Sequence, residues 1–136
     1  MTTSTISAII PCEIQKVWET LSAVESYPVW RSDVEQIERN GEKQFTEHTK
    51  DGYVTAFMVT AAEPRKRLEL DLENSHVKGR WMFTLASKAD GTELRLTADA
   101  EAKQLTTRPV GKSVFERTYL KKEQEQFVRD LKELLS

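Results

Sequence analysis

The residues of this sequence that could take part in chemistry lie mainly on a helical segment near the C-terminus. Arg117 and Gln124 interrupt an otherwise apolar stripe there, and Glu116 and Glu123 flank it. In an apolar pocket, a single arginine could bind a ligand carboxylate through two parallel hydrogen bonds, and a buried glutamate would have a raised pKa suited to acid–base catalysis. The alternative is that all four are ordinary solvated helix residues, because charged side chains are rarely buried without a partner.

Large aromatic side chains could form the walls of such a pocket. Pockets for small molecules are lined mainly by apolar and aromatic side chains, with a few polar groups that orient the ligand. Taken singly, each of these aromatic residues fits a plain core better than a ligand contact. Together with Arg117 and Gln124, the candidate ligand contacts are Trp30, Phe57, Trp81, Phe83, Phe115 and Tyr119.

Other kinds of chemistry have no support in the sequence. The two histidines, His48 and His76, belong to no zinc-binding pattern, and the five glycines form no phosphate-binding loop. A G-x-S-x-G nucleophile motif is absent. Cys12 is the only cysteine, which excludes an internal disulfide and a multi-thiolate metal site. We therefore expect no metal, no cofactor and no catalytic residue that can be named.

The composition is typical of a globular protein. The 136 residues are 38% hydrophobic and 31% charged, enough for one domain spanning residues 1–136 with its own core. The 20 basic residues against 22 acidic ones leave no positive excess for nucleic acid. No apolar run approaches the roughly 20 residues of a membrane-spanning helix. The first residues, MTTSTIS, do not have the pattern of a secretion signal, so we expect none. We expect a cytoplasmic monomer or homodimer.

The longest helical pattern runs from Ser113 to Leu135. It contains no glycine or proline and is rich in Glu, Lys, Gln, Leu and Arg, which favour helices. Apolar residues recur on one face at three- and four-residue steps, at Leu120, Phe127, Leu131 and Leu134. The stripe is dense in the second half and mixed in the first. This predicts a helix that is packed solidly at one end and borders a space at the other.

A strand and two short helices are expected near the N-terminus. Residues Thr3–Ile10 are rich in β-branched side chains and end at Pro11. A helix over Glu13–Leu21 follows, with Cys12 at its N-cap. The segment Ser22–Ser32 is long enough for only one or two further helical turns.

The middle of the chain has the pattern of successive β-hairpins. Tight hairpins need residues that adopt positive φ, and the chain supplies them as Asn40-Gly41, Asp51-Gly52 and Asp90-Gly91. With further turns at 63–65 and 74–76, these separate six candidate strands at 34–39, 43–50, 53–62, 67–73, 77–87 and 92–103.

Alternation of apolar and polar residues predicts that the sheet has one dry face. That face would contain Leu68, Leu70, Leu72, Trp81, Phe83, Leu85, Leu94, Leu96, Ala98 and Ala100. In the strand at 53–62 both alternating sets are apolar, so its orientation stays open. A twisted sheet of this length curls, and the long helix is available to cover its dry face. The predicted arrangement permits a cavity beside the mixed half of the helix.

Five local strings carry a resemblance to a known family: residues 10–18 (IPCEIQKVW), 26–30 (SYPVW), 63–68 (EPRKRL), 79–85 (GRWMFTL) and 127–132 (FVRDLK). They resemble the START-like superfamily, and more closely its SRPBCC or polyketide cyclase/dehydrase group. The resemblance implies an α+β helix-grip fold. In that fold a seven-stranded antiparallel sheet wraps around the long C-terminal helix, two short helices follow the first strand, and an internal cavity accepts apolar or amphipathic molecules.

Three functions are compatible with this resemblance. The leading hypothesis is binding of a small hydrophobic or amphipathic molecule in the cavity. The second is a cyclase or dehydratase type of enzyme acting on a polyketide-like or aromatic substrate, which requires at least two polar groups that converge on one site. The third is a protein-interaction module similar to chaperone activators, which requires an exposed apolar patch.

Overall fold

The computed structural model describes the backbone of residues 2–103 and 109–136, and the side chains of residues 2–103 and 117–136. The elements follow in the order β1 (Thr2–Ile10), α1 (Ile14–Ser22), η1 (Val24–Ser26), α2 (Tyr27–Trp30), β2 (Val34–Arg39), β3 (Gln44–Thr49), β4 (Val54–Glu63), β5 (Arg67–Glu73), β6 (Val77–Lys88), β7 (Gly91–Ala102) and α3 (Pro109–Leu135). The short η1 is a single 3-10 turn.

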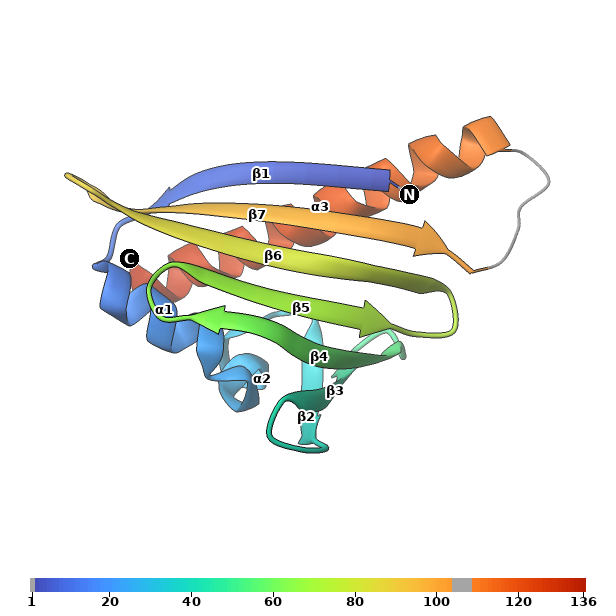
Figure 1. Cartoon of the computed structure of the whole chain (residues 1–136), viewed down its shortest axis with the longest axis horizontal. Coiled ribbons are helices and arrows are strands. Elements are labelled where there is room, and N and C mark those ends of the chain that lie inside the picture. The colour runs from blue at the N-terminus through green and yellow to red at the C-terminus, as the bar shows by residue number, and fades with distance from the viewer. Residues whose placement is uncertain (1, 104–108) are drawn as a thin grey trace.

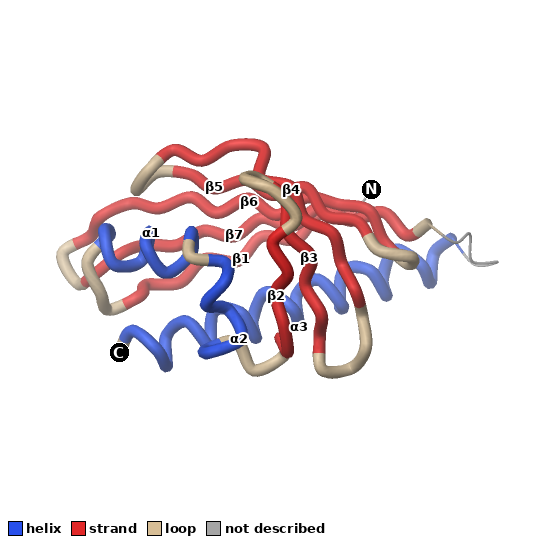
Figure 2. The backbone as a smooth tube through the Cα atoms, turned by 90° about the horizontal axis from the view of Figure 1, so that it is seen from below, coloured by secondary structure: helices blue, strands red, loops and turns tan. Residues whose placement is uncertain are grey.

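The seven strands form one antiparallel sheet in the order β1-β7-β6-β5-β4-β3-β2. From β2 to β7, strands that follow one another in the chain pair, and β1 pairs with β7, so that β1 and β2 are the two edge strands. Helix α3 lies along one face of the sheet (Figure 1), and β2 and β3 turn down across that helix (Figure 2). The α+β helix-grip fold implied by the resemblance is confirmed.

The face of the sheet towards α3 is the predicted dry face. Leu68, Leu70, Phe83, Leu94, Leu96, Ala98 and Ala100 are buried there, and Leu72, Trp81 and Leu85 are partly buried. Strand β4, whose orientation the pattern left open, directs Phe57 inward because Phe57 pairs with Phe45 on β3 and Leu72 on β5. The alternate residues Val54 and Met58 are exposed on the outer face.

Phe127 of α3 is the centre of the aromatic core. Its ring centre lies 5.2 Å from that of Phe83, 5.3 Å from that of Trp30 and 5.9 Å from that of Trp81, in edge-on or tilted contacts. Such pairs contribute about 0.5–1.5 kcal/mol each beyond the burial of their area. Phe127 and Leu131 are buried, as the dense stripe predicted, whereas Leu134 near the end of the helix is 45% exposed, contrary to the prediction.

Two polar contacts also hold α3 in place. The side chain of Gln124 is fully buried; its amide donates to the carbonyls of Ser4 (2.8 Å) and Leu96 (3.0 Å) and accepts from the Ser4 hydroxyl (2.7 Å). At the other side of the helix, the Asp130 carboxylate accepts from the backbone N–H and the hydroxyl of Ser32, at 2.8 and 2.9 Å. These contacts tie α3 both to β1 and β7 and to the segment before β2.

Two predicted helix starts are wrong. Helix α1 has Glu13 at its N-cap, without a side-chain capping bond, because Cys12 belongs to a turn in which its N–H donates to the Ile10 carbonyl (2.7 Å). Helix α3 begins at Pro109, four residues before the predicted start. Proline is favoured in the first helical turn, where its missing N–H is not needed.

Candidate functional site

A cavity of about 100 Å³ lies between the inner face of the sheet and α3. Its walls come from β3 to β7, from α3, and from the segment that joins α2 to β2. On α3 the lining residues are Tyr119, Leu120, Glu123 and Phe127. The cavity thus borders the mixed half of the helix and its junction with the dense half.

The inner wall of the cavity is aromatic. Phe57, Trp81 and Phe83 line it, and Phe45 stacks on Phe57 with ring centres 4.9 Å apart and nearly parallel planes. Alternation along β4 and β6 directs these rings towards α3. This wall would contact the apolar part of a ligand.

One side of the cavity contains a buried cluster of charges around Arg31. Its Nη1 donates to the Glu47 carboxylate at 2.8 Å and its Nη2 donates to the Asp33 carboxylate at 3.1 Å. The guanidinium also lies over the rings of Phe127 and Tyr27, 5.0 and 5.4 Å from their centres. Burial by itself lowers the pKa of Arg31, but the two carboxylates outweigh it and the net pKa is raised. Arg31 is therefore permanently cationic.

The carboxylates of this cluster share one cation. Burial, opposed by Arg31 and reinforced by the nearby Asp33, raises the pKa of Glu47 above its usual value. Among the described residues, Arg31 Nε and Asp33 Oδ1 have no hydrogen-bond partner although both atoms are buried. Tyr27 stays neutral, because burial raises its pKa and its hydroxyl donates to the Leu21 carbonyl at 2.5 Å.

The mouth of the cavity is formed by two tyrosines and a glutamate. Tyr53 and Tyr119 line the cavity yet are 39% and 41% exposed, so they mark its boundary with solvent. The Tyr119 hydroxyl is hydrogen-bonded to Glu123. Burial first, and then the negative charge of Asp33, raise the pKa of Glu123. The ring of Tyr53 in turn lies edge-on to His76, with centres 5.4 Å apart.

The structure brings some of the sequence-predicted site residues together and separates others. Phe57, Trp81, Phe83 and Tyr119 line the cavity. Trp30 packs in the core against Phe127, the amide of Gln124 is occupied by Ser4 and Leu96, and Arg117 is exposed. The side chain of Phe115 lies outside the described residues. The role of each as a ligand contact stays a prediction.

The Arg31 cluster was missed by the sequence reasoning. One local signal existed. Glu47 lies two residues after the buried Phe45 on β3, so its carboxylate points to the same dry face of the sheet. Its partner Arg31 directly follows the aromatic corner of α2. Their pairing could not be predicted from the sequence, since they lie sixteen positions apart in the chain.

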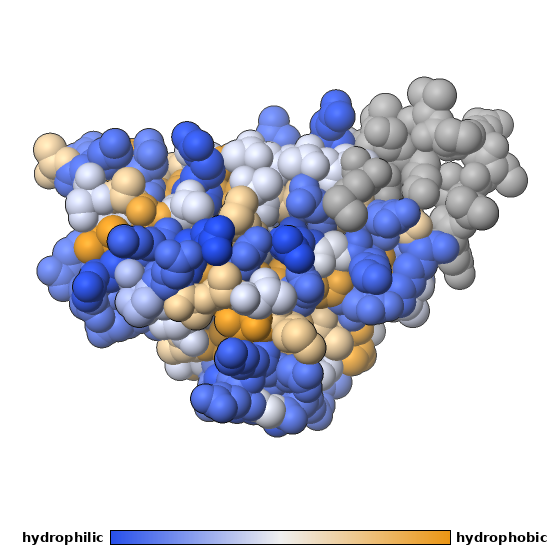
Figure 3. Space-filling model, viewed as in Figure 1, coloured by the Kyte–Doolittle hydropathy of each residue, from blue (hydrophilic) through white to orange (hydrophobic). Residues whose placement is uncertain are grey.

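A larger concavity of about 860 Å³ lies on the outer face of the sheet. Figure 3 shows that this face is mostly hydrophilic. Ala56 and Met58 line it together with charged residues that pair with one another, such as Asp71 and Arg80 at 2.9 Å. This surface is open to solvent and largely hydrophilic, so it is less suited than the inner cavity to enclosing an apolar molecule. Within the described residues, no cluster of metal-binding side chains is found and no helix could span a membrane.

A curled antiparallel sheet closed by a long helix, with a cavity between them, is the helix-grip arrangement. The chain belongs to the family described as polyketide cyclase / dehydrase and lipid transport, whose model matches residues 1–136.

Solved structures agree with this assignment at the level of the fold. A START superfamily protein from Mycobacterium smegmatis aligns with a TM-score of 0.82 and 16% identity, over 99% of this chain and 97% of that one. An aromatase/cyclase from Streptomyces sp. R1128 aligns with a TM-score of 0.83 and 12% identity, over 98% and 92% of the two chains. A protein from Mesorhizobium loti reaches 22% identity with a TM-score of 0.77, over 98% and 96%. The comparison with curated proteins finds no significant match.

Proposed function

We propose that this protein binds a small hydrophobic or amphipathic molecule in the cavity between the sheet and α3. The observation that carries the proposal is the division of the cavity wall into an aromatic part, with Phe57, Trp81 and Phe83, and a polar part around Arg31 and Glu123. An apolar wall with a few convergent polar groups is the usual character of a small-molecule site.

The size of the cavity limits what it encloses. Its volume of about 100 Å³ is well below the roughly 300–1,000 Å³ of sites for drug-sized ligands. It is closer to an engineered apolar cavity of about 150 Å³ that binds benzene. We therefore expect a ligand of a few carbon atoms, or one end of a larger molecule that extends past Tyr53 and Tyr119 into solvent.

A specific observation also favours a second candidate, an enzyme of the cyclase or dehydratase type. The cavity contains several polar groups that converge on one space, which is the condition that catalysis requires. Glu123, with its raised pKa and its hydrogen bond from Tyr119, is suited to move a proton to or from a bound carbonyl compound. The arginine in that space is Arg31 rather than Arg117. NMR detection of deuterium uptake at the α-carbon of an enolisable ketone, lost in Glu123→Gln, would support this activity.

Native mass spectrometry of the freshly purified protein tests the binding function. We expect a discrete mass in addition to that of the protein, from a bound molecule that denaturing extraction releases. Ala100 is 4% exposed and lines the cavity. Ala100→Leu should therefore fill the space and remove the added mass, while the native mass spectrum still shows the folded protein. Ala56→Leu, on the outer face of β4, is the matched control.

The proposal would be wrong if Ala100→Leu kept the added mass. It would also be wrong if the wild type were free of bound mass and its melting temperature did not respond to a panel of lipids, aromatic acids and small amines. A thermal melt of each variant establishes that it is folded before binding is judged.

A further inference from the structure

Charge in the cavity is unbalanced. Arg31 is the one cationic side chain among the described lining residues, which include five carboxylates: Asp33, Glu47, Asp51, Asp99 and Glu123. Arg31, Asp33 and Glu47 lie close enough to Glu123 to affect its ionisation. The cavity wall therefore carries an excess of acidic groups, and ionisation of Glu123 adds to its negative charge.

Arg31 is not free to attract an anionic ligand. Both terminal nitrogens of its guanidinium are engaged, Nη1 by Glu47 at 2.8 Å and Nη2 by Asp33 at 3.1 Å. A carboxylate on a ligand would have to displace one of these partners and would meet two or three like charges at short range. Like charges at such distances are strongly unfavourable where water is scarce.

Glu123 offers the opposite opportunity. None of the described cations forms an ion pair with it, and it stands at the mouth beside two tyrosine rings, those of Tyr119 and Tyr53. Aromatic faces and a carboxylate at one opening are the groups that hold an ammonium ion, through cation–π attraction and a charge-assisted hydrogen bond. Asp51 also lines this opening and adds to the negative field.

We propose that the ligand of the cavity is a small amine, whose ammonium group binds Glu123 between Tyr53 and Tyr119 and whose hydrocarbon part lies against Trp81, Phe83 and Phe57. This inference rests on the proposed function and names the chemical class of the ligand. Asp33 is consistent with it, because its Oδ1 lacks a hydrogen-bond donor within the described protein.

Three probes of equal length separate the charge of the ligand from its apolar part: pentylamine, pentan-1-ol and pentanoate. Isothermal titration calorimetry at pH 7 and low salt measures each. The change in the intrinsic tryptophan fluorescence, to which Trp81 at the cavity wall contributes, provides a second readout. A charge-assisted hydrogen bond is worth about 1.5–3 kcal/mol, so the amine should bind about tenfold or more tighter than the alcohol. The carboxylate should bind weakest of the three.

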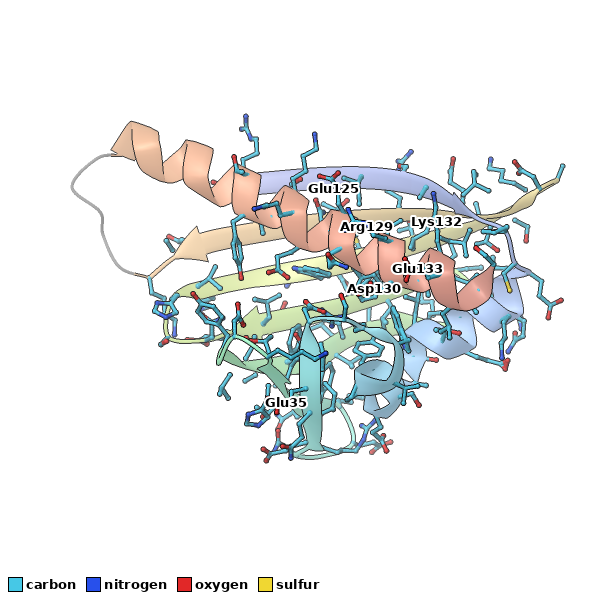
Figure 4. The ribbon with its side chains drawn as sticks, turned by 180° about the vertical axis from the view of Figure 1, so that it is seen from behind. Glu35, Glu125, Arg129, Asp130, Lys132 and Glu133 are labelled. Atoms are coloured by element: carbon cyan, nitrogen blue, oxygen red, sulfur yellow. The ribbon has the colours of Figure 1, made fainter. Side chains whose placement is uncertain are left out.

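Two variants on the same helix locate the effect. Glu123→Gln should reduce the preference for the amine over the alcohol to less than about threefold, a difference of roughly 0.6 kcal/mol. Glu125→Gln should retain the full preference, because Glu125 lies on the solvent side of α3 (Figure 4). If both variants lost the preference, the preference would come from the net charge of the protein and not from a contact with Glu123, and the proposal would be overturned.

The outcomes also separate this inference from the proposed function. Tighter binding of pentanoate, or equal binding of the amine and the alcohol, would overturn the amine proposal and leave a binding cavity in place. If no probe binds and the wild type carries no mass in native spectrometry, both proposals fail.

Discussion

Arg31 Nη1 and Glu47 Oε2 lie 2.8 Å apart, and both residues are only 6% exposed. This ion pair joins the segment after α2 to strand β3 at the wall of the cavity. Buried ion pairs of this kind add little net stability, because removing two charges from water offsets most of their attraction. Their loss is costly only when one partner is left behind.

Arg31→Met should therefore destabilise the protein by about 3–5 kcal/mol at pH 7, because it leaves Glu47 and Asp33 without a cation. Urea unfolding monitored by circular dichroism measures the change. Arg39→Met is the control, since Arg39 and Glu25 form an exposed pair at 2.6 Å that should contribute less than about 1 kcal/mol. Similar losses in the two variants would contradict the buried role of Arg31.

Glu123→Gln should stabilise the protein at pH 7. The folded-state pKa of Glu123 lies above its reference value of 4.5, so the carboxyl favours folding below that pH. This contribution is lost as the pH rises through the folded pKa. Glutamine is neutral at every pH and can still accept from Tyr119. We expect a gain of about 0.5–2 kcal/mol at pH 7.

The pH dependence provides the check on this prediction. The difference between Glu123→Gln and the wild type should shrink towards zero at about pH 4, where both side chains are neutral. Glu125→Gln, on the exposed side of the same helix, should show little change at either pH. A stabilisation by Glu123→Gln that was equal at pH 4 and pH 7 would rule out the carboxylate as its cause.

Gly79→Ala should prevent stable folding. A Cβ at this position of β6 would lie 2.1 Å from the backbone oxygen of Asp99 on β7 and 3.2 Å from the Ala100 Cα, and paired backbone cannot move away cheaply. We expect a loss of more than about 3 kcal/mol or insoluble protein. Gly41→Ala, whose Cβ would meet nothing closer than 3.9 Å, should be tolerated. A cooperative thermal melt for Gly79→Ala near that of the wild type would be inconsistent with the close approach.

Gln124→Met should lower stability without removing ligand binding. The thioether has a similar shape but leaves the Ser4 hydroxyl and two backbone carbonyls without the amide, at a cost of about 1–3 kcal/mol. The bound mass in native spectrometry should persist, because Gln124 does not line the cavity. Loss of the bound mass from a variant that still melts cooperatively would restore Gln124 as a ligand contact, as its sequence position suggested.

Much of this architecture could be predicted from the sequence because its causes are local. Turn residues such as Asp51-Gly52 and Asp90-Gly91 set where strands end, and both glycines adopt the positive φ that such turns need. Period-two alternation identified Leu70, Phe83 and Leu96 as inward-facing, and the apolar stripe of α3 located both its packed half and its open half. These features depend on residues within a few positions of one another.

The contents of the cavity were decided by contacts between distant residues. Period and composition could not orient β4, and its pairing with Phe45 and Leu72 did so. They could not show that Arg31 forms an ion pair with Glu47. Nor could they show that the Gln124 amide is hydrogen-bonded to Ser4, 120 positions away in the chain. Residue type and spacing predict which side chains are polar. Only the packing of the sheet against α3 determines which polar groups are satisfied by one another and which remain for a ligand.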